Sequence, residues 1–368
     1  MARETHGIVL VARGQPPTYE RIVIEQPGPH EVGIRMVVSG LCHTDLAAVR
    51  DARVTPVLLG HEGAGVVEVV GSDVTHVRPG DHVVINWQPR CGQCRRCVAG
   101  REDLCENIQG TATPRVFWRG QPLNLLLQAG TFSPYVVVPA QGAIPIRHDL
   151  PFEQAALLGC AVATGVGAAL YTAHVQAGAG VVVLGVGGVG VNVIQGARLA
   201  HAHPIIAIDR DEQRLDLARV CGATHAINSS AEDALRAVQN LTGGRGIEYV
   251  FEVVGIPELM EQGIEMLARG GALILVGAAA RDATMRFHPR RFMSQQQTIL
   301  GCIYGNIRPF RDVPLFADWA MSGKLRLDLF PLRAIRLEDA PAAFRETRAG
   351  GELRTIIRFD NGDDCEDV

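Results

Sequence analysis

The sequence lacks an excess of positive charge. Its 35 lysines and arginines face 39 aspartates and glutamates, which gives a formal net charge of -4 at pH 7. Nucleic-acid-binding proteins carry a basic patch that neutralises phosphates, so we expect no nucleic-acid partner. Aromatic residues make up only 5% of the chain and include three tryptophans, too few for the interfacial belt of membrane proteins. We therefore expect no membrane association.

Long hydrophobic runs are also missing. The most apolar stretch, 181–193, is interrupted by glycines and is too short to cross a bilayer. The N-terminal segment MARETHGIVLVARGQ lacks the small-residue cleavage site of a secretory signal. In a long chain without an export signal, nine cysteines indicate metal ligation rather than disulfides. These features predict a cytoplasmic protein.

The length of 368 residues and the change in sequence pattern along the chain indicate two domains. Up to about residue 150, short apolar runs between proline and glycine turns predict an antiparallel β region. From residue 151, strands alternate with helices, which predicts an α/β fold with a doubly wound parallel sheet. β character returns from residue 300, with a helix near 314–321 and a closing strand RTIIRF. We expect a coenzyme domain at 162–303, inserted between the catalytic-domain pieces 1–161 and 304–368.

Four cysteines lie close together in the sequence RCGQCRRCVAGREDLC. Cys91, Cys94, Cys97 and Cys105 have the spacing C-x2-C-x2-C-x7-C. Four thiolates predict a closed, tetrahedral structural zinc site in a lobe at about 90–106. An iron–sulfur cluster is the other centre that such ligands bind, but the last gap fits neither common ferredoxin spacing. A loop of reduced, unliganded thiols is the remaining alternative.

A glycine-rich turn follows the strand-like segment VVVLGV. Gly185, Gly187 and Gly190 form G-x-G-x-x-G, with Gly188 and Val189 inside the turn and a helix-like segment after it. This context is typical of a dinucleotide-binding fold. Asp209 ends the next strand, where a carboxylate binds the adenosine ribose and favours NAD over NADP. Arg210, directly after it, is the type of residue that accommodates the 2'-phosphate of NADP, so NADP stays the less favoured alternative.

Three more residues have metal-ligand side chains but no informative spacing. Cys42 lies in GLCHTD, His61 in GHEGAG and Cys160 in GCAVATG. Each is weak evidence alone, because a buried free cysteine is common in protein cores. Together with the cysteine lobe, the glycine motif GVGGVG and the terminal LRTII, these segments resemble the zinc-dependent medium-chain alcohol dehydrogenases. The resemblance covers nearly the whole chain.

This resemblance implies a GroES-like catalytic domain, a Rossmann coenzyme domain and two Zn²⁺ per chain. Cys42, His61 and Cys160 are implied to hold the catalytic zinc and to leave one position open for a substrate oxygen. Asp45 is implied to orient the zinc histidine, and Glu62 to lie behind the metal. Thr44 is implied to contact the substrate oxygen. Because Ala47 stands where many relatives have a relay histidine, the proton route is expected to use His43, the cofactor ribose or water.

Further roles follow from the same resemblance. His43, Arg214 and Arg354 are implied to contact the pyrophosphate or ribose of the cofactor. Thr164, Val189 and Val276 are implied to position the nicotinamide, although ordinary core packing explains the two valines nearly as well. The implied substrate pocket consists of Trp87, Leu126, Leu127, Ala278 and Ile303. This apolar lining favours a medium-chain or aromatic alcohol, yet all five residues also suit an ordinary core.

The sequence thus favours an NAD-dependent zinc alcohol dehydrogenase that interconverts a primary alcohol and its aldehyde. The first alternative is a dehydrogenase of an S-hydroxymethyl thiol adduct, linked to mycothiol or glutathione. Two further readings are a cofactor-binding regulatory protein without catalysis and a zinc-free quinone reductase. The complete set of implied zinc ligands disfavours both of these. By the family resemblance, we expect a homodimer or homotetramer.

Overall fold

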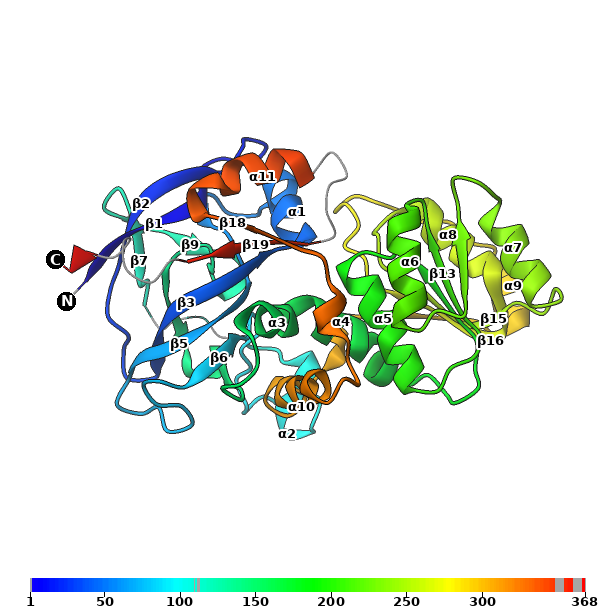
Figure 1. Cartoon of the computed structure of the whole chain (residues 1–368), viewed down its shortest axis with the longest axis horizontal. Coiled ribbons are helices and arrows are strands. Elements are labelled where there is room, and N and C mark those ends of the chain that lie inside the picture. The colour runs from blue at the N-terminus through cyan, green and yellow to red at the C-terminus, as the bar shows by residue number, and fades with distance from the viewer. Residues whose placement is uncertain (1, 109, 111–112, 348–353, 360–365, 368) are drawn as a thin grey trace. The chain divides into compact units, whose positions relative to one another are not determined.

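The computed structural model describes residues 2–108, 110, 113–347, 354–359 and 366–367. The chain forms two compact units. The first unit contains Met1–Cys160, Arg308–Gly323 and Phe330–Val368, and the second contains Ala161–Ile307 and Lys324–Leu329. The second unit is therefore inserted into the first, and the chain returns to it briefly at Lys324–Leu329. Figure 1 shows the β-rich first unit in blue, cyan and red and the second unit mainly in green and yellow.

Two β-sheets form the first unit. One has the order β8-β7-β2-β1-β4-β9, with β20 paired to β1. The other has the order β11-β6-β5-β3-β19-β18, with β10 paired to β3. Pairing is mainly antiparallel, as the sequence predicts, except that β4 runs parallel to β9 and β18 to β19. The strands of the first sheet are β1 (Arg3–Leu10), β2 (Thr18–Ile24), β4 (Val57–Leu58), β7 (Val116–Trp118), β8 (Gln121–Pro122), β9 (Asn124–Leu125) and β20 (Glu366–Asp367). Those of the second are β3 (Glu31–Leu41), β5 (Glu62–Val70), β6 (His82–Ile85), β10 (Tyr135–Pro139), β11 (Ala143–Pro145), β18 (Leu332–Ile335) and β19 (Arg354–Arg358).

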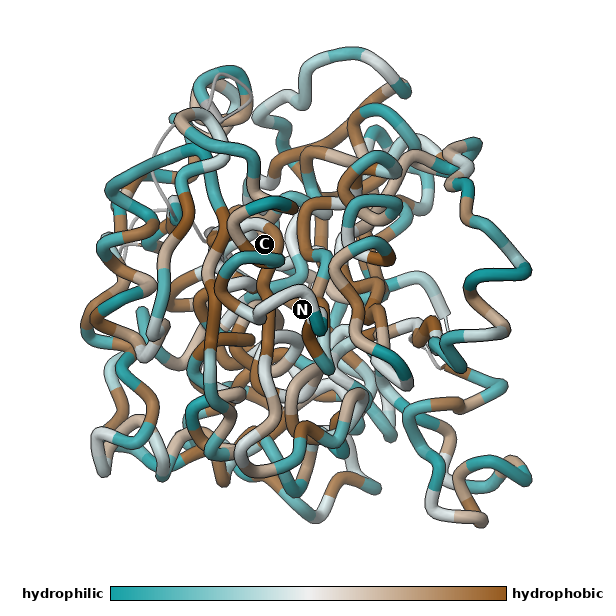
Figure 2. The backbone as a smooth tube through the Cα atoms, turned by 90° about the vertical axis from the view of Figure 1, so that its right-hand side faces the viewer, coloured by the Kyte–Doolittle hydropathy of each residue, from teal (hydrophilic) through white to brown (hydrophobic). Residues whose placement is uncertain are grey.

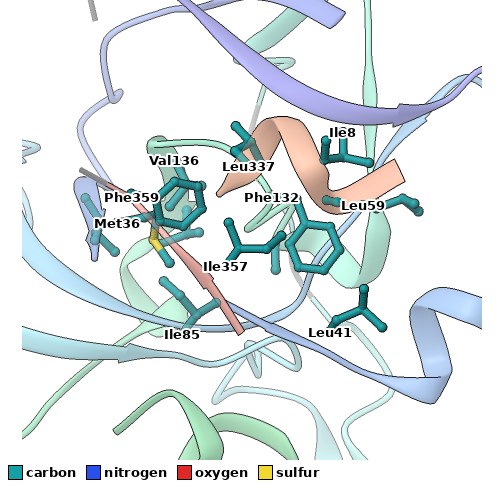
Figure 3. Packing of buried hydrophobic residues seen from close by; sticks show 14 of the residues in the cluster. Ile8, Met36, Leu41, Leu59, Ile85, Phe132, Val136, Leu337, Ile357 and Phe359 are labelled. Carbon is teal, nitrogen blue, oxygen red and sulfur yellow. The ribbon is translucent and has the colours of Figure 1, made fainter. Parts of the chain in front are cut away.

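The core of the first unit follows the two-residue period of its strands. On β1, Ile8 and Leu10 face the larger cluster of buried apolar side chains, while Val9 faces a smaller one. Figure 3 shows the larger cluster, in which Ile8, Phe132 and Ile357 come from segments far apart in the sequence. The helices of this unit are α1 (His43–Asp51), α2 (Arg95–Val98), α3 (Phe152–Leu157), α10 (Pro309–Met321) and α11 (Ala340–Thr347). α10 begins five residues before the predicted start at Pro314, because Pro309 occupies its first turn.

The second unit contains a six-stranded parallel sheet of the order β14-β13-β12-β15-β16-β17. Numbered within the unit, this is 3-2-1-4-5-6, the Rossmann order. The strands are β12 (Val181–Leu184), β13 (Ile205–Asp209), β14 (His225–Asn228), β15 (Ile247–Glu252), β16 (Leu267–Leu275) and β17 (Thr298–Gly301). The helices are α4 (Ala163–Gly167), α5 (Gly188–Leu199), α6 (Glu212–Cys221), α7 (Ala234–Leu241), α8 (Pro257–Met266) and α9 (Pro289–Gln295). In Figure 1, α5 and α6 lie on one side of the strands and α7 and α9 on the other, which is a doubly wound arrangement.

Hydropathy follows this layering. In Figure 2, many hydrophilic stretches lie in outer loops, while hydrophobic stretches gather inside. One helical stretch, Phe152–Thr172, is long and apolar enough by composition to cross a membrane. However, 78% of its most apolar window is buried inside the protein, and a buried core helix meets the same criteria. The stretch is also not a regular α-helix, because π-helical turns at Leu158–Val162 and Ala168–Thr172 flank α4.

Candidate active site

Strand register brings Cys42 and His61 together. Gly40 on β3 pairs with Glu62 on β5, and the chain continues from these positions to Cys42 and back to His61. Cys42 is the N-cap residue of α1. Cys160 comes from the π-helical turn Leu158–Val162 that follows α3. All three side chains are buried.

The three candidate ligand atoms converge on one point. The Cys42 and Cys160 Sγ atoms lie 3.9 Å apart, and Cys160 Sγ lies 3.4 Å from His61 Nε2. All three atoms lie within 4.8 Å of one another. Two sulfurs bound to one tetrahedral zinc at about 2.3 Å are separated by about 3.8 Å, so this geometry fits the ion. A buried cluster of two thiols and an imidazole therefore fits zinc with three protein ligands.

Asp45 stabilises both segments that carry the ligands. Its Oδ2 accepts the backbone N–H of Cys42 at 3.0 Å, and its Oδ1 accepts that of Gly60 at 3.0 Å. Oδ1 also lies 3.5 Å from His61 Nδ1. Burial by itself lowers the pKa of His61, but the Asp45 carboxylate outweighs it and holds that pKa well above its usual value. The side chain thus fixes the orientation of the imidazole, with Nε2 toward the two sulfurs.

The two thiols affect each other's charge. Cys160, through its contact with Cys42, lowers the pKa of Cys42 well below its usual value, and His61 lowers it further against the opposing effect of burial. The same contact, together with burial, raises the pKa of Cys160. The contact therefore favours ionisation of Cys42 over that of Cys160. A cation in the pocket would favour both thiolates.

A buried ion pair lies beside this cluster. Arg354, at the start of β19, donates from Nη2 to Glu62 Oε2, and both side chains are buried. Burial raises the pKa of Glu62 to about 7, although the charge of Arg354 opposes the shift. The absent side chain of Gly40 leaves room for the carboxylate, because a Cβ on Gly40 would collide with Glu62 Oε1. Neither this pair nor the role of Gly40 could be predicted from the sequence, since 292 residues separate Glu62 from Arg354.

The four-cysteine lobe forms a second cluster within the first unit. The sulfurs of Cys91, Cys94, Cys97 and Cys105 all lie within 4.8 Å of one another. Backbone N–H groups also donate to the sulfurs. The N–H of Cys94 donates to Cys91 Sγ and the N–H of Cys91 donates to Cys105 Sγ, both at 3.4 Å. Backbone donors at Glu106 and Cys97 lower the pKa of Cys94 to about 6. Four converging sulfurs with donors that favour thiolates fit a closed zinc site.

The glycine motif of the second unit joins β12 to α5. Gly185 has a left-handed φ of 95°. A Cβ on Gly190 would collide with the Gly185 carbonyl oxygen, whereas a Cβ on Gly187 would meet nothing within 4 Å. The turn therefore needs glycine at Gly185, close helix packing needs it at Gly190, and the backbone at Gly187 is open to a ligand. These are the three roles of glycine in a dinucleotide fingerprint.

Asp209 lies where the sequence predicts, at the end of β13. Its Oδ2 accepts the backbone N–H of Val186 at 2.7 Å, so the side chain points toward the glycine turn. Its Oδ1 accepts the N–H groups of Arg210 and Asp211. The Arg214 side chain lies 3.7 Å from Asp211. Asp209 therefore links the glycine turn to the start of α6.

The remaining predicted residues are divided between the units. In the first unit, His43 is exposed and Thr44 half-buried in the first turn of α1, and Trp87 has its ring 6.3 Å from that of His61 in an edge-to-face contact. Leu126 packs against the larger core cluster, and Leu127 adopts a left-handed φ of 50°. The second unit holds the other five, namely Thr164, Val189 and Val276, which are half-buried, and Ala278 and Ile303, which are exposed. Each of these side chains is at least partly exposed within its own unit.

Comparisons with known proteins cover both units. A family model of the alcohol dehydrogenase GroES-like domain matches residues 28–148, and one of the zinc-binding dehydrogenase domain matches residues 188–321. S-(hydroxymethyl)glutathione dehydrogenase of Paracoccus denitrificans is 34% identical over 96% of this chain and 100% of that protein. Alcohol dehydrogenase class-3 of Cereibacter sphaeroides is 35% identical over the same shares of the two chains.

Solved structures show the same similarity. An alcohol dehydrogenase zinc-binding domain protein from Burkholderia ambifaria has a TM-score of 0.91 and 33% identity, covering 98% of this chain and 100% of that one. Benzyl alcohol dehydrogenase from Acinetobacter calcoaceticus has a TM-score of 0.89 and 29% identity, covering 97% and 99%.

The matched domains define a two-domain, zinc-binding dehydrogenase with a GroES-like and a Rossmann-type part. The chain belongs to the zinc-dependent medium-chain alcohol dehydrogenase family. It is thus an oxidoreductase that acts on CH–OH groups, and its family uses zinc and NAD(H). The predicted family, fold class and enzyme class are confirmed.

Proposed function

We propose that this alcohol dehydrogenase oxidises the hydroxyl of an S-hydroxymethyl thiol adduct, formed from formaldehyde and a low-molecular-weight thiol, with NAD as the oxidant. The reaction balances as RS–CH2–OH plus NAD⁺ giving RS–CHO, NADH and a proton. The observation that carries the reaction class is the buried cluster of Cys42, His61 and Cys160, whose ligand atoms lie within 4.8 Å of one another.

Support for the thiol adduct comes from the relatives. Proteins named S-(hydroxymethyl)glutathione dehydrogenase align with 96–97% of this chain at 34–35% identity. The sequence alone favours a free primary alcohol and ranks the adduct second. The relatives reverse that order. The carrier thiol, glutathione or mycothiol, is to be identified by experiment.

The residues of the first unit have distinct proposed tasks. Cys42, His61 and Cys160 hold the zinc, which when bound supplies a Lewis acid that lowers the pKa of a substrate hydroxyl. Asp45 keeps the imidazole in orientation. The Thr44 hydroxyl accepts the proton of the substrate hydroxyl and gives up its own proton, which His43, exposed at the start of α1, takes up and releases to water. The buried ion pair of Glu62 and Arg354 stabilises the structure beside Cys42.

In the second unit, we propose that the glycine turn binds the pyrophosphate of NAD and that Asp209 binds the adenosine ribose. The open backbone at Gly187 supports the first role. A carboxylate at the end of β13 supports NAD over NADP, because it repels a 2'-phosphate.

The four-cysteine lobe of the first unit holds a second zinc, whose role is structural.

A second candidate substrate is an aromatic or medium-chain primary alcohol. It is favoured by the fold similarity to a benzyl alcohol dehydrogenase and by the apolar side chains of Trp87, Leu126 and Leu127. NADH formation separates the two candidates. We expect turnover of formaldehyde only when glutathione or mycothiol is present, at a kcat/KM well above that of benzyl alcohol. Equal turnover of formaldehyde with and without each thiol, or a preference for benzyl alcohol, would exclude the adduct.

Metal analysis tests the site itself. We expect about two zinc ions per chain in the wild type, from one closed and one open site. Cys42→Ser should lose one zinc and all turnover while the fold persists. Cys221→Ser is the matched control, because Cys221 is also buried but lies outside both clusters. Full activity of Cys42→Ser would remove the catalytic assignment.

A further inference from the structure

Glu252 is a fully buried carboxylate to which the proposed chemistry gives no task. It is the last residue of β15, in the second unit. Its Oε1 accepts three backbone N–H groups, from Val254 at 2.9 Å, Gly255 at 2.8 Å and Ile256 at 3.4 Å. Its carbonyl oxygen accepts two more, from Val276 and Gly277, both at 2.9 Å. One residue thus holds the turns that follow two neighbouring strands, β15 and β16.

These two turns are in close backbone contact. Gly255 has a left-handed φ of 87°, and a Cβ on it would lie 2.7 Å from the carbonyl oxygen of Ala278. A Cβ on Gly277 would collide with the Gly255 nitrogen. The turn at 253–256 therefore has little freedom to shift, and three of its four N–H groups donate to one oxygen of Glu252. Its conformation depends on that carboxylate.

The same turn packs against the glycine motif. Val253 donates its N–H to Leu184 at the end of β12, at 3.1 Å. A Cβ on Gly185 would collide with the Val254 side chain. Dinucleotides bind beyond the carboxyl ends of the strands where the strand order reverses, which here is between β12 and β15. Val254 and Ile256 are 45% and 41% exposed at this edge although both are apolar. The turn thus presents apolar surface beside the proposed pyrophosphate site.

We propose that Glu252 is a positioning residue for dinucleotide binding, whose buried carboxyl group holds Val254 and Ile256 in place beside the glycine turn. Preorganising a binding surface raises affinity because less conformational freedom is lost on binding. Burying a carboxylate is costly, and burial does raise the pKa of Glu252 against the three N–H donors. Its Oε2 has no hydrogen-bond partner among the residues that the structure describes. A buried, half-satisfied acid at this edge is explained if it serves the ligand site. This inference rests on the proposed use of a nicotinamide dinucleotide.

The test compares two isosteric variants of the same strand. Glu252→Gln keeps the size of the side chain and an acceptor oxygen but removes the charge that strengthens the three hydrogen bonds. Glu248→Gln is the control, because Glu248 is exposed near the opposite end of β15 and also accepts a backbone N–H, from Gly180 at 2.8 Å. We expect Glu252→Gln to raise the Kd for NADH, measured by fluorescence titration, about tenfold. The KM for NAD should rise in parallel, while the KM for the alcohol and kcat at saturating NAD stay near wild type.

The outcomes are distinct. Equal NADH affinity in Glu252→Gln and wild type overturns the proposal, and so does a loss of thermal stability without a change in Kd. If Glu252→Gln fails to fold, Gly255→Ala displaces the same turn and leaves the carboxylate in place. Unchanged NADH affinity in that variant also overturns the proposal. A wild-type protein that binds no NADH would instead refute the proposed function.

Discussion

Replacing Asp45 with asparagine should weaken both the fold and zinc binding. The Asp45 carboxylate, fully buried, accepts one backbone N–H on each oxygen, from Cys42 and from Gly60. Asparagine offers one oxygen and one NH2 group, so one of these N–H groups would face another donor. Leaving one buried donor without an acceptor costs about 1–3 kcal/mol in the free energy of unfolding. Losing the carboxylate beside a metal-binding histidine lowers metal affinity about 10- to 100-fold.

Two measurements test this prediction. Urea unfolding of the zinc-free protein gives the loss of stability, and titration with a competing chelator gives the zinc affinity. The control is Asp211→Asn, because Asp211 also accepts two backbone N–H groups, at the N-cap of α6, where asparagine and aspartate are equivalent. We expect the control to be near wild type in both assays. Wild-type zinc affinity in Asp45→Asn would refute the proposed role of the carboxylate.

Two other predictions concern the first unit. Cys97→Ser should reduce zinc from about two to about one ion per chain and lower the thermal midpoint, because a closed site contributes folding energy; an unchanged midpoint in thermal unfolding would contradict this. The ring of His82 lies 4.3 Å from that of His148, and burial and then that neighbour lower the pKa of His82. The folded chain therefore binds a proton on His82 less tightly than the unfolded chain does. The stability that this difference leaves intact above the usual histidine pKa of about 6.5 is lost as the pH falls below that value. His82→Gln should reduce the loss between pH 7 and 5 in urea unfolding, and parallel pH profiles of variant and wild type would contradict the prediction.

Features set by local spacing could be predicted from the sequence. The four cysteines of the lobe lie within 15 residues, so their convergence requires only a short loop and the one-turn helix α2. The glycine motif likewise defines its own turn, because Gly185 adopts a left-handed φ and a Cβ on Gly190 would collide with the Gly185 carbonyl oxygen. β12 falls within the strand-like segment VVVLGV, and Asp209 ends β13 as the sequence predicts.

Features set by distant pairing could not be predicted. β17 (Thr298–Gly301) adds a sixth strand to the parallel sheet, whereas the sequence pattern indicates only a return of β character from residue 300 and does not assign it to this sheet. A short apolar run indicates a strand but does not say which sheet it joins. α8, α9 and α11 were also missed. Cys160 lies in a π-helical turn, which no simple periodicity reveals.

The geometry of the proposed zinc site follows from the register of a single strand. Gly40 on β3 pairs with Glu62 on one side and with Ile356 on β19 on the other. The end of β3 thus determines the position of Cys42. The start of β5 determines that of His61, and the start of β19 determines that of Arg354. A slip of one residue in either pairing would turn the side chains of that strand to the opposite face of the sheet. Ligand geometry and the buried pair of Glu62 and Arg354 are therefore not independent, because both depend on the register of β3.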